Sequence, residues 1–411
     1  MQAQALSRTL SMAKRSPFYA KRLAGNNVDF PGLPLTTKED LRSGYPYAFL
    51  AVPRREVATY HESSGTTGQP IASFLTAADW RECADRFNRT AARLEREDWV
   101  LVKTPYSMAT TAHQMHNAAL TRGATVVPAD NRTSMMPYLR VLHLLDSLDI
   151  SVTWSLPSEP LFWAAAAWAC DRVPANIGKS LRALVVAGEP LADAKRKRIG
   201  EIWHARVIED YGSTETTSLA GECSHGVLHA WADRFLMEVY DPRTSNMSPR
   251  GTGQLVVTTL YREAMPLIRY NLEDVVELSD EPCACGWVLP RIRVLGRTSD
   301  KARNGISVPS QTAIDDVIYR LPMEFRALFW RGIVIDKQLR LDVETTSALA
   351  TECERRLTAE LERDIGLPAD VRAVPEGTLV SHQLLLHESA FVKPRFLFSS
   401  VDEWERGLIY Q

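Results

Sequence analysis

The stretch from Tyr60 to Pro70, YHESSGTTGQP, contains residue types that bind phosphate. Gly65 and Gly68 let the backbone turn tightly and expose its N–H groups, and the hydroxyl side chains around them add further donors. These hydroxyl side chains belong to Ser63, Ser64, Thr66 and Thr67. The stretch lacks the GxxxxGK[ST] form of a P-loop, because Gln69 stands where a lysine is expected. It predicts a phosphate cradle, and a Ser/Thr/Gly surface turn is the alternative.

Two later segments carry residues that suit the rest of a nucleotide. The segment DYGSTE runs from Asp210 through Gly212 to Glu215 and follows a strand-like run. Tyr211 could stack on a purine, Thr214 could donate to a phosphate, and Glu215 could hold Mg²⁺. The segment RYNLED ends in Asp274, whose carboxylate can accept from both hydroxyls of a ribose. Taken singly, a strand-ending turn with a solvated glutamate and a surface aspartate are the alternatives.

A third set of residues has the spacing of metal ligands. Cys283 and Cys285 form a CxCG turn, and the upstream segment ECSHGVLH carries a cysteine and two histidines. Two distant pairs of soft ligands that flank one β-rich region suit a single tetrahedral Zn²⁺. The predicted ligands are Cys223, His229, Cys283 and Cys285, with His225 as the alternative to His229. A structural ion is expected, because four protein ligands leave no open position for catalysis. Four unmetallated residues in neighbouring loops are the other interpretation.

The elements that must position these residues follow from the apolar pattern. Thr76 and Asp79 form a possible capping pair for a helix over residues 79–97. Short apolar runs separated by helix-like stretches indicate buried strands alternating with helices, which is typical of a layered α/β body. The runs are 100–102, 124–127, 151–154 and 183–187, followed by the strand-like runs 254–259 and 274–278.

The chain beyond Gly296 has a different pattern. A helix is expected over 312–321, a hairpin over 333–343, a charged helix over 346–365 and a strand over 371–374. This order suits a small α+β domain. We therefore predict an α/β fold with a large layered N-terminal body that has a β-rich end, and a small mobile α+β C-terminal domain. The predicted boundaries are 1–296 for the body, 297–300 for a hinge and 301–411 for a C-terminal lid.

Composition limits the classes of protein. The 411 residues are 45% hydrophobic and 24% charged, which is typical of a globular enzyme. A net charge of −2 gives no field that attracts nucleic acid, and the longest apolar run has ten residues against the roughly 20 of a membrane span. Six cysteines are too few for a disulfide framework, so a cytoplasmic location is expected. Cys83, Cys170 and Cys353 are predicted to be buried small side chains.

The order of motifs resembles the adenylate-forming enzyme superfamily and, within it, the phenylacetate-CoA ligase family. Eight segments match in family order, from residue 16 to about 318. They are SPFYAKRL (16–23), LPLTTKEDLRSGYPYAFLAVPRREV (33–57), SSGTTGQP (63–70), AGEPL (187–191), DYGSTE (210–215), TTLYREAMPLIRYNLEDVV (258–276), CACGWVLPRIRVLGRTSD (283–300) and VPSQTAIDDVI (308–318).

The resemblance implies activation of a carboxylic acid by MgATP as an acyl adenylate, with transfer to a thiol of CoA or of a carrier-protein phosphopantetheine. By similarity, Ser63 to Gly68 would close over the phosphates, Tyr211 would stack on adenine and Asp274 would bind the ribose. Gly188 and Glu189 would lie beside the base, and Glu215 would ligate Mg²⁺. Asp210, Gly212 and Thr214 complete the nucleotide-binding set.

Two departures from the family pattern affect the C-terminal part. Attack of a carboxylate on the α-phosphorus brings two anions together, so a cation is expected there, and in the family it is a C-terminal lysine. Lys393 in FVKPRFLF is the candidate, although Val392 replaces the glycine that usually precedes the lysine. A solvated charge at a strand end is the alternative. In the hinge, Arg297 is kept for the ribose or phosphate, whereas Ser299 replaces an acid.

The acid pocket is expected to lie along residues 105–123 and near Ala187 and Gly188. Polar and bulky groups crowd the first stretch, which favours a small or polar aromatic acid with amino or hydroxy substituents. They are Tyr106, Met108, His113 and His116. Transfer of the adenylate to an amine or another non-thiol acceptor, and a non-catalytic nucleotide-binding homologue, are the alternatives. The oligomeric state is left open, with a homodimer as one candidate.

Overall fold

The computed structural model of the chain describes residues 2–24, 29–63, 69–131, 136–297, 308–387, 396–398 and 400–406. By their contacts, these residues form two compact units. Unit 1 comprises 1–96, 105–124 and 208–298, and unit 2 comprises 97–104, 125–207 and 299–411. The predicted segments Ser64 to Gly68, 298–307 and the stretch around Lys393 lie outside the described residues.

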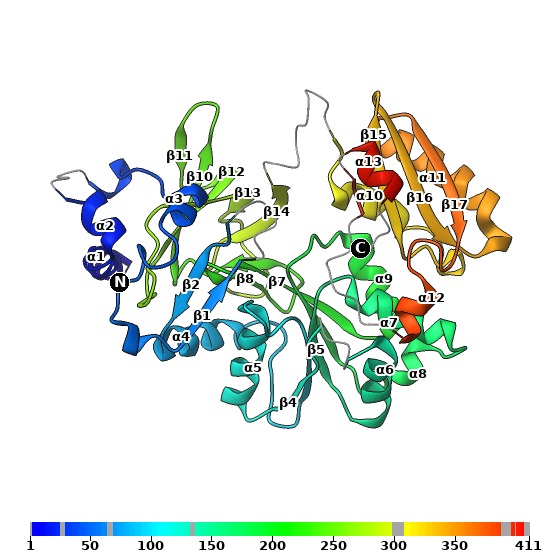
Figure 1. Ribbon diagram of the computed structural model, residues 1–411, viewed down its shortest axis with the longest axis horizontal. Coiled ribbons are helices and arrows are strands. Elements are labelled where there is room, and N and C mark those ends of the chain that lie inside the picture. Colours follow the sequence, from blue (N-terminus) through cyan, green and yellow to red (C-terminus); the bar gives the residue numbers. More distant parts are fainter. Residues whose placement is uncertain are drawn as a thin grey trace. The chain divides into compact units, whose positions relative to one another are not determined.

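Unit 1 is built on antiparallel strands in the order β11-β10-β12-β13-β14-β9-β8-β7, with a separate hairpin β1-β2 (Figure 1). Its core packs Tyr19, Phe49, Trp231 and Tyr270 among aliphatic side chains of these strands. Its elements are α1 (Gln2–Ala13), α2 (Pro17–Arg22), α3 (Lys38–Ser43), β1 (Thr59–Glu62), β2 (Ala72–Leu75), α4 (Ala77–Phe87), α5 (Thr111–Arg122), β7 (Arg206–Ser213), β8 (Thr217–Glu222), β9 (Leu228–Ala230), β10 (Phe235–Asp241), β11 (Asn246–Ser248), β12 (Gly251–Thr259), β13 (Tyr270–Ser279) and β14 (Arg291–Arg297).

Unit 2 contains the parallel strands β6-β5-β3-β4 and a second sheet, β15-β16-β17. The inner strands β5 and β6 are fully buried, as expected for a sheet covered by helices, whereas the edge strand β4 has no fully buried residue. Its elements are β3 (Trp99–Lys103), β4 (Thr125–Pro128), α6 (Tyr138–Ser147), β5 (Val152–Ser155), α7 (Glu159–Ala169), α8 (Pro174–Ile177), β6 (Ala183–Val186), α9 (Asp193–Trp203), α10 (Gln311–Ile318), β15 (Trp330–Ile335), β16 (Gln338–Thr345), α11 (Ala350–Ile365), β17 (Ala369–Pro375), α12 (His382–His387) and α13 (Val401–Arg406).

The predicted α/β fold is confirmed, and the predicted strands and the C-terminal helix, hairpin, helix and strand are all present. In the hairpin β15-β16, Asp336 and Lys337 both have positive φ, as a two-residue turn requires. The division into body, hinge and lid stays a prediction.

In the described part of unit 2, α10 packs on α9 through a buried ion pair. Lys195 Nζ and Asp315 Oδ2 lie 3.8 Å apart.

Two local predictions were wrong. The helix expected over 79–97 has the predicted Thr76/Asp79 capping box, but it ends at Phe87. The chain after Phe87 forms a hydrogen bond with β8, in which the Ala91 N–H donates to the Glu222 carbonyl at 2.8 Å. Cys170 is exposed at the end of α7, whereas Cys83 and Cys353 are buried as expected.

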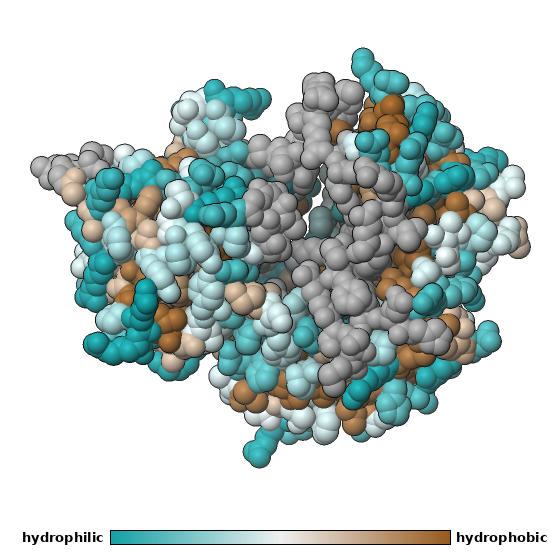
Figure 2. Space-filling view, in the orientation of Figure 1, coloured by the Kyte–Doolittle hydropathy of each residue, from teal (hydrophilic) through white to brown (hydrophobic). Residues whose placement is uncertain are grey.

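Hydrophilic and hydrophobic residues are interspersed over the face that Figure 2 shows. Among the described residues, the structure has no helix with both the length and the apolar composition needed to cross a membrane.

Candidate functional site

The β7-β8 hairpin of unit 1 carries the segment from Asp210 to Glu215. At Gly212 a Cβ atom would lie 2.1 Å from the Thr217 carbonyl oxygen, so a residue without a side chain is required for the hairpin to close. Thr217 itself has a φ of 60°. This tight turn brings the hairpin tip toward β13, the strand that contains Asp274.

Tyr211, Asp274 and Arg297 meet in unit 1. The Tyr211 hydroxyl donates to Asp274 Oδ2 at 2.7 Å, and Arg297 Nε lies 3.5 Å from Asp274 Oδ1. Burial, together with the Asp274 charge, raises the pKa of Tyr211 well above its usual value, so the phenol stays protonated and acts as the donor. Three residues that the sequence placed around one nucleotide therefore lie in direct contact.

Glu215 and Tyr270 form a second pair of this kind. The Tyr270 hydroxyl donates to Glu215 Oε1 at 3.1 Å, and both residues are buried. Burial raises the pKa of Tyr270 well above its usual value, and the Glu215 charge adds to the effect. Sequence reasoning missed Tyr270. The available signal was its place four residues before Asp274, the same spacing that separates Tyr211 from Glu215.

Asp210 lies inside the base of the hairpin. Its carboxylate accepts from the Ser218 hydroxyl at 2.6 Å, and the indole N–H of Trp231 donates to Ser218 Oγ at 3.0 Å. Burial raises the pKa of Asp210 to about 7. These contacts give Asp210 a role in holding the hairpin, while its contact with a nucleotide, and that of Thr214, stay predictions.

Only the two ends of the phosphate-loop segment lie within the described residues. The Ser63 N–H donates to the Ile71 carbonyl at 3.0 Å, and Ser63 Oγ accepts from the Ile71 N–H at 2.9 Å. Ser63 therefore joins the strands β1 and β2 on either side of the loop. The loop residues Ser64, Gly65, Thr66, Thr67 and Gly68 lie outside the described residues.

The pocket residues predicted along 105–123 gather around Tyr106. Its hydroxyl lies 3.1 Å from His116 Nδ1, and His113 Nε2 donates to its carbonyl oxygen at 3.1 Å. Burial lowers the pKa of His116, which favours the neutral form of its ring. The carbonyl oxygen of Met108 accepts from the Glu62 N–H at 2.9 Å, which ties the turn before α5 to the strand that leads into the phosphate loop.

His61 is a further member of this group that the sequence analysis missed. It lies on β1 and makes edge contacts with His113 and Trp80, with ring centroids 5.1 and 5.5 Å apart. It is 2% exposed, and burial lowers its pKa to about 4. His61 is the one buried residue of the four in β1, and its place directly before the phosphate-loop motif was the signal available in the sequence.

Three predicted residues follow β6 in unit 2. Gly188 has a φ of +85°, which a glycine adopts without strain. The Glu189 carboxylate accepts from the Ser158 N–H at 3.1 Å and from its hydroxyl at 3.0 Å. Ala187 lies between these residues and β6, and its N–H donates to the Ser155 carbonyl at 3.2 Å. The turn is thus held by the N-terminus of α7, and its contact with base and acid stays a prediction.

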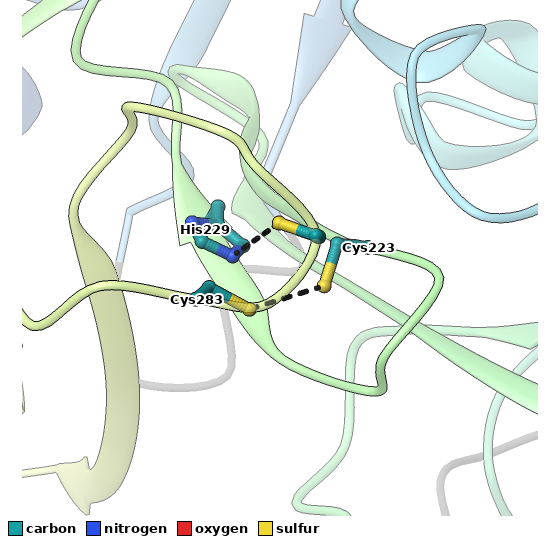
Figure 3. A group of neighbouring side chains, drawn as sticks. Cys223, His229 and Cys283 are labelled. Atoms are coloured by element: carbon teal, nitrogen blue, oxygen red, sulfur yellow. Dashed lines mark hydrogen bonds between the residues drawn. The ribbon is translucent and has the colours of Figure 1, made fainter.

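The structure brings Cys223, His229, Cys283 and Cys285 together, with their possible ligand atoms all within 4.8 Å of one another (Figure 3). Cys223 Sγ lies 3.9 Å from Cys283 Sγ, and Cys285 Sγ lies 3.5 Å from His229 Nε2. His229 Nδ1 is 2.8 Å from the Leu289 carbonyl oxygen, which leaves Nε2 facing the thiols.

The alternative ligand His225 does not belong to this group of side chains. Its backbone N–H donates to Cys223 Sγ at 3.4 Å, but its ring contacts the Ser224 hydroxyl. The backbone N–H of Cys285 lowers the pKa of the Cys283 thiol to about 6. Three sulfur donors and one imidazole nitrogen are a donor set that fits one tetrahedral soft ion.

The chain is similar to known proteins over most of its length. The AMP-binding enzyme family model matches residues 25–258. A phenylacetate-coenzyme A ligase of Thermus thermophilus is 31% identical and covers 92% of each chain. A phenylacetate-coenzyme A ligase of Pseudomonas putida is also 31% identical, over 85% of this chain and 82% of its own length.

A crystal structure of 2-hydroxyisobutyryl-CoA ligase, in its postadenylation state with 2-HIB-AMP, has a similar fold. The TM-score is 0.85 at 21% identity, and the match covers 98% of this chain and 90% of that chain.

Proposed function

This chain belongs to the AMP-binding enzyme family, with relatives among the phenylacetate-coenzyme A ligases, and from that premise we propose that it activates a carboxylic acid with ATP and transfers the acyl group to CoA. The contact of Tyr211, Asp274 and Arg297 is the observation that carries this proposal. It supports the proposal because an aromatic ring and a guanidinium group both contact one carboxylate.

Each step of the proposed reaction has a residue that suits it. A carboxylate oxygen of the acid attacks the α-phosphorus of ATP, and pyrophosphate leaves, so an acyl adenylate forms. The thiol of CoA then attacks the acyl carbon and AMP leaves. Asp274 would hold the ribose, the Tyr211 ring would contact the adenine, and Glu215 would ligate Mg²⁺, which neutralises phosphate charge when bound. The loop that Ser63 closes, and Gly188 with Glu189, would complete the nucleotide site.

The lysine expected near the α-phosphate is assigned in this proposal to Lys393, on a lid over 301–411 joined by a hinge at 297–300. Lys393→Ala should slow adenylation by about 100-fold or more, because the charge that offsets two approaching anions is lost. Lys337→Ala is the matched control, since Lys337 is exposed in the β15-β16 turn. Unchanged pyrophosphate release by Lys393→Ala would exclude the assignment.

The proposed acid is aromatic with an amino or hydroxy substituent. The Tyr106 hydroxyl and the His116 ring, 3.1 Å apart, are half-buried polar groups on the turn before α5 and on α5 itself. An amino or hydroxy substituent that bonds to this pair would favour a substituted acid over its unsubstituted analogue. His113 lies next to this pair, whereas Met108 is 44% exposed.

Pyrophosphate release, measured over a panel of acids with and without CoA, tests this proposal. The panel contains amino- and hydroxybenzoates, phenylacetate, unsubstituted benzoate and aliphatic hydroxy acids. Release with a substituted aromatic acid and a thioester product with CoA are expected. Release without a thioester would favour a carrier-protein phosphopantetheine or an amine as acceptor. No release with any acid would favour a nucleotide-binding homologue without catalysis.

We also propose that Cys223, His229, Cys283 and Cys285 hold one structural zinc ion. The mutual approach of their ligand atoms within 4.8 Å supports this, as does the Leu289 carbonyl that orients His229. Four protein donors leave no open position, so a role in holding the loops after β8 and β13 is expected rather than catalysis.

A further inference from the structure

The two nucleotide segments of unit 1 hold each other through a reciprocal pair of hydrogen bonds. Each segment has a tyrosine followed four residues later by a carboxylate, Tyr211 with Glu215 and Tyr270 with Asp274. The Tyr211 hydroxyl donates to Asp274, and the Tyr270 hydroxyl donates to Glu215. Each phenol therefore fixes the carboxylate of the opposite segment.

The two pairs differ in their other partners. Asp274 also contacts Arg297, whose side chain is 64% exposed, so two groups fix its orientation. Glu215 Oε1 accepts only from Tyr270 among the described residues, and Oε2 has no hydrogen bond in that part of the chain. The orientation of Glu215 thus depends on one phenol.

The backbone of Tyr270 is held firmly enough for this task. Tyr270 begins β13, where it is paired with Val257 of β12 and bridged to Thr36. The Asn271 N–H donates to the Thr36 carbonyl at 2.9 Å, and the Tyr270 side chain is fully buried. Glu215, in contrast, lies in the connection between β7 and β8, where a side chain needs an outside contact to stay in one rotamer.

We propose that Tyr270 is a positioning residue that holds Glu215 by Oε1 so that Oε2 is presented to the divalent cation of the nucleotide. This inference rests on the proposed function, because it takes Glu215 as the ligand of that cation. A preformed ligand needs no reordering when the cation arrives, so loss of the phenol should weaken cation binding more than acid binding.

The first test compares Tyr270→Phe with the wild-type chain. Phenylalanine keeps the buried ring and removes only the hydroxyl. Pyrophosphate release is measured against Mg²⁺ concentration at saturating ATP and acid. A hydrogen bond to a charged group contributes about 1.5 kcal/mol. The apparent Mg²⁺ constant, which is the Mg²⁺ concentration that gives half of the maximal rate, should therefore rise about tenfold. The KM for the acid should change less than twofold.

Tyr319→Phe is the matched control. Tyr319 is a buried phenol of unit 2 whose hydroxyl donates to the Leu328 carbonyl at 2.8 Å. Its loss should lower stability without changing the Mg²⁺ dependence. The Tyr270→Phe effect should also vanish in a Glu215→Gln background. An unchanged apparent Mg²⁺ constant in Tyr270→Phe, or an equal change in Tyr319→Phe, would overturn the proposal.

A second measurement separates this inference from the proposed function. Binding of Mn²⁺ in the presence of a non-hydrolysable ATP analogue is followed by electron paramagnetic resonance on the same variants. A dissociation constant about tenfold higher in Tyr270→Phe alone supports the positioning role even if no acid is activated. Activity on an acid combined with equal Mn²⁺ binding in all three chains would reject the positioning role and keep the proposed function.

Discussion

The cysteine–histidine group and the tyrosine–carboxylate pairs lie on the same antiparallel sheet of unit 1, yet their side chains are satisfied in different ways. In the first group, sulfur atoms contact one another and backbone N–H groups at 3.3 to 3.9 Å. In the second, each carboxylate accepts a hydrogen bond from a phenol on the opposite segment. In the proposals above, the first group would hold an ion permanently, whereas the second would serve a ligand that binds and leaves.

The largest expected effect follows from removal of a cysteine. Cys283→Ser should reduce bound zinc from about one ion per chain to near zero and lower the free energy of unfolding by about 3 kcal/mol or more, because binding energy in such sites is folding energy. Metal content by mass spectrometry and denaturant unfolding measure the two quantities.

Cys170→Ser is the matched control, because Cys170 is exposed at the end of α7 and lies outside the group. It should keep both zinc and stability. Wild-type protein that contains no zinc, or a Cys283→Ser variant as stable as the wild type, would reject the structural role and leave four unmetallated side chains.

A smaller loss, confined to activity, is expected at the other region. Asp274→Asn removes the negative charge of a carboxylate that would accept hydrogen bonds from the ribose hydroxyls. The same carboxylate lies 3.5 Å from Arg297 Nε. The value of kcat/KM for ATP should fall about 100-fold, equivalent to roughly 2.7 kcal/mol, with little change in stability. Initial rates of pyrophosphate release at varied ATP give this value.

Glu273→Gln is the neighbouring control, since its carboxylate pairs with Lys38 at 3.4 Å and is 49% exposed. Its activity should stay within about twofold of the wild type. A stability loss in Asp274→Asn as large as that in Cys283→Ser would remove the contrast between the two regions.

Much of this arrangement could be predicted from the sequence. The strands over 100–102, 151–154 and 183–187 are apolar runs, and such runs form buried parallel strands wherever helices cover a sheet. The capping box of Thr76 and Asp79 is local, so it was also visible. The end of α4 was missed, because the hydrogen bond from Ala91 to Glu222 is a contact between residues far apart in the chain.

The site shows the same limit. Tyr211, Glu215 and Asp274 were found from their residue types, whereas Tyr270 and His61 were missed although both lie within the quoted segments. A tyrosine or histidine in a strand resembles any core residue until its partner is known, and the partner is set by the pairing of distant strands. The choice of His229 over His225 also depended on ring direction, which spacing does not give.

The smallest expected effect concerns Asp210, which lies in the nucleotide segment but is bonded like a structural residue. Burial raises its pKa to about 7, above the roughly 3.9 of an unfolded chain. Between these values the folded state binds a proton that the unfolded state does not, so the free energy of unfolding falls as pH rises from about 4 to 7. Asp210→Asn cannot titrate and keeps an acceptor for Ser218, so its stability relative to the wild type should increase by about 1.4 kcal/mol between pH 6 and pH 8. Urea unfolding of both chains across that range measures the difference, in which the buried acids Glu159 and Glu344 cancel because both chains contain them. Parallel pH profiles, together with a loss of ATP binding in Asp210→Asn, would instead place Asp210 with Asp274 in the nucleotide site.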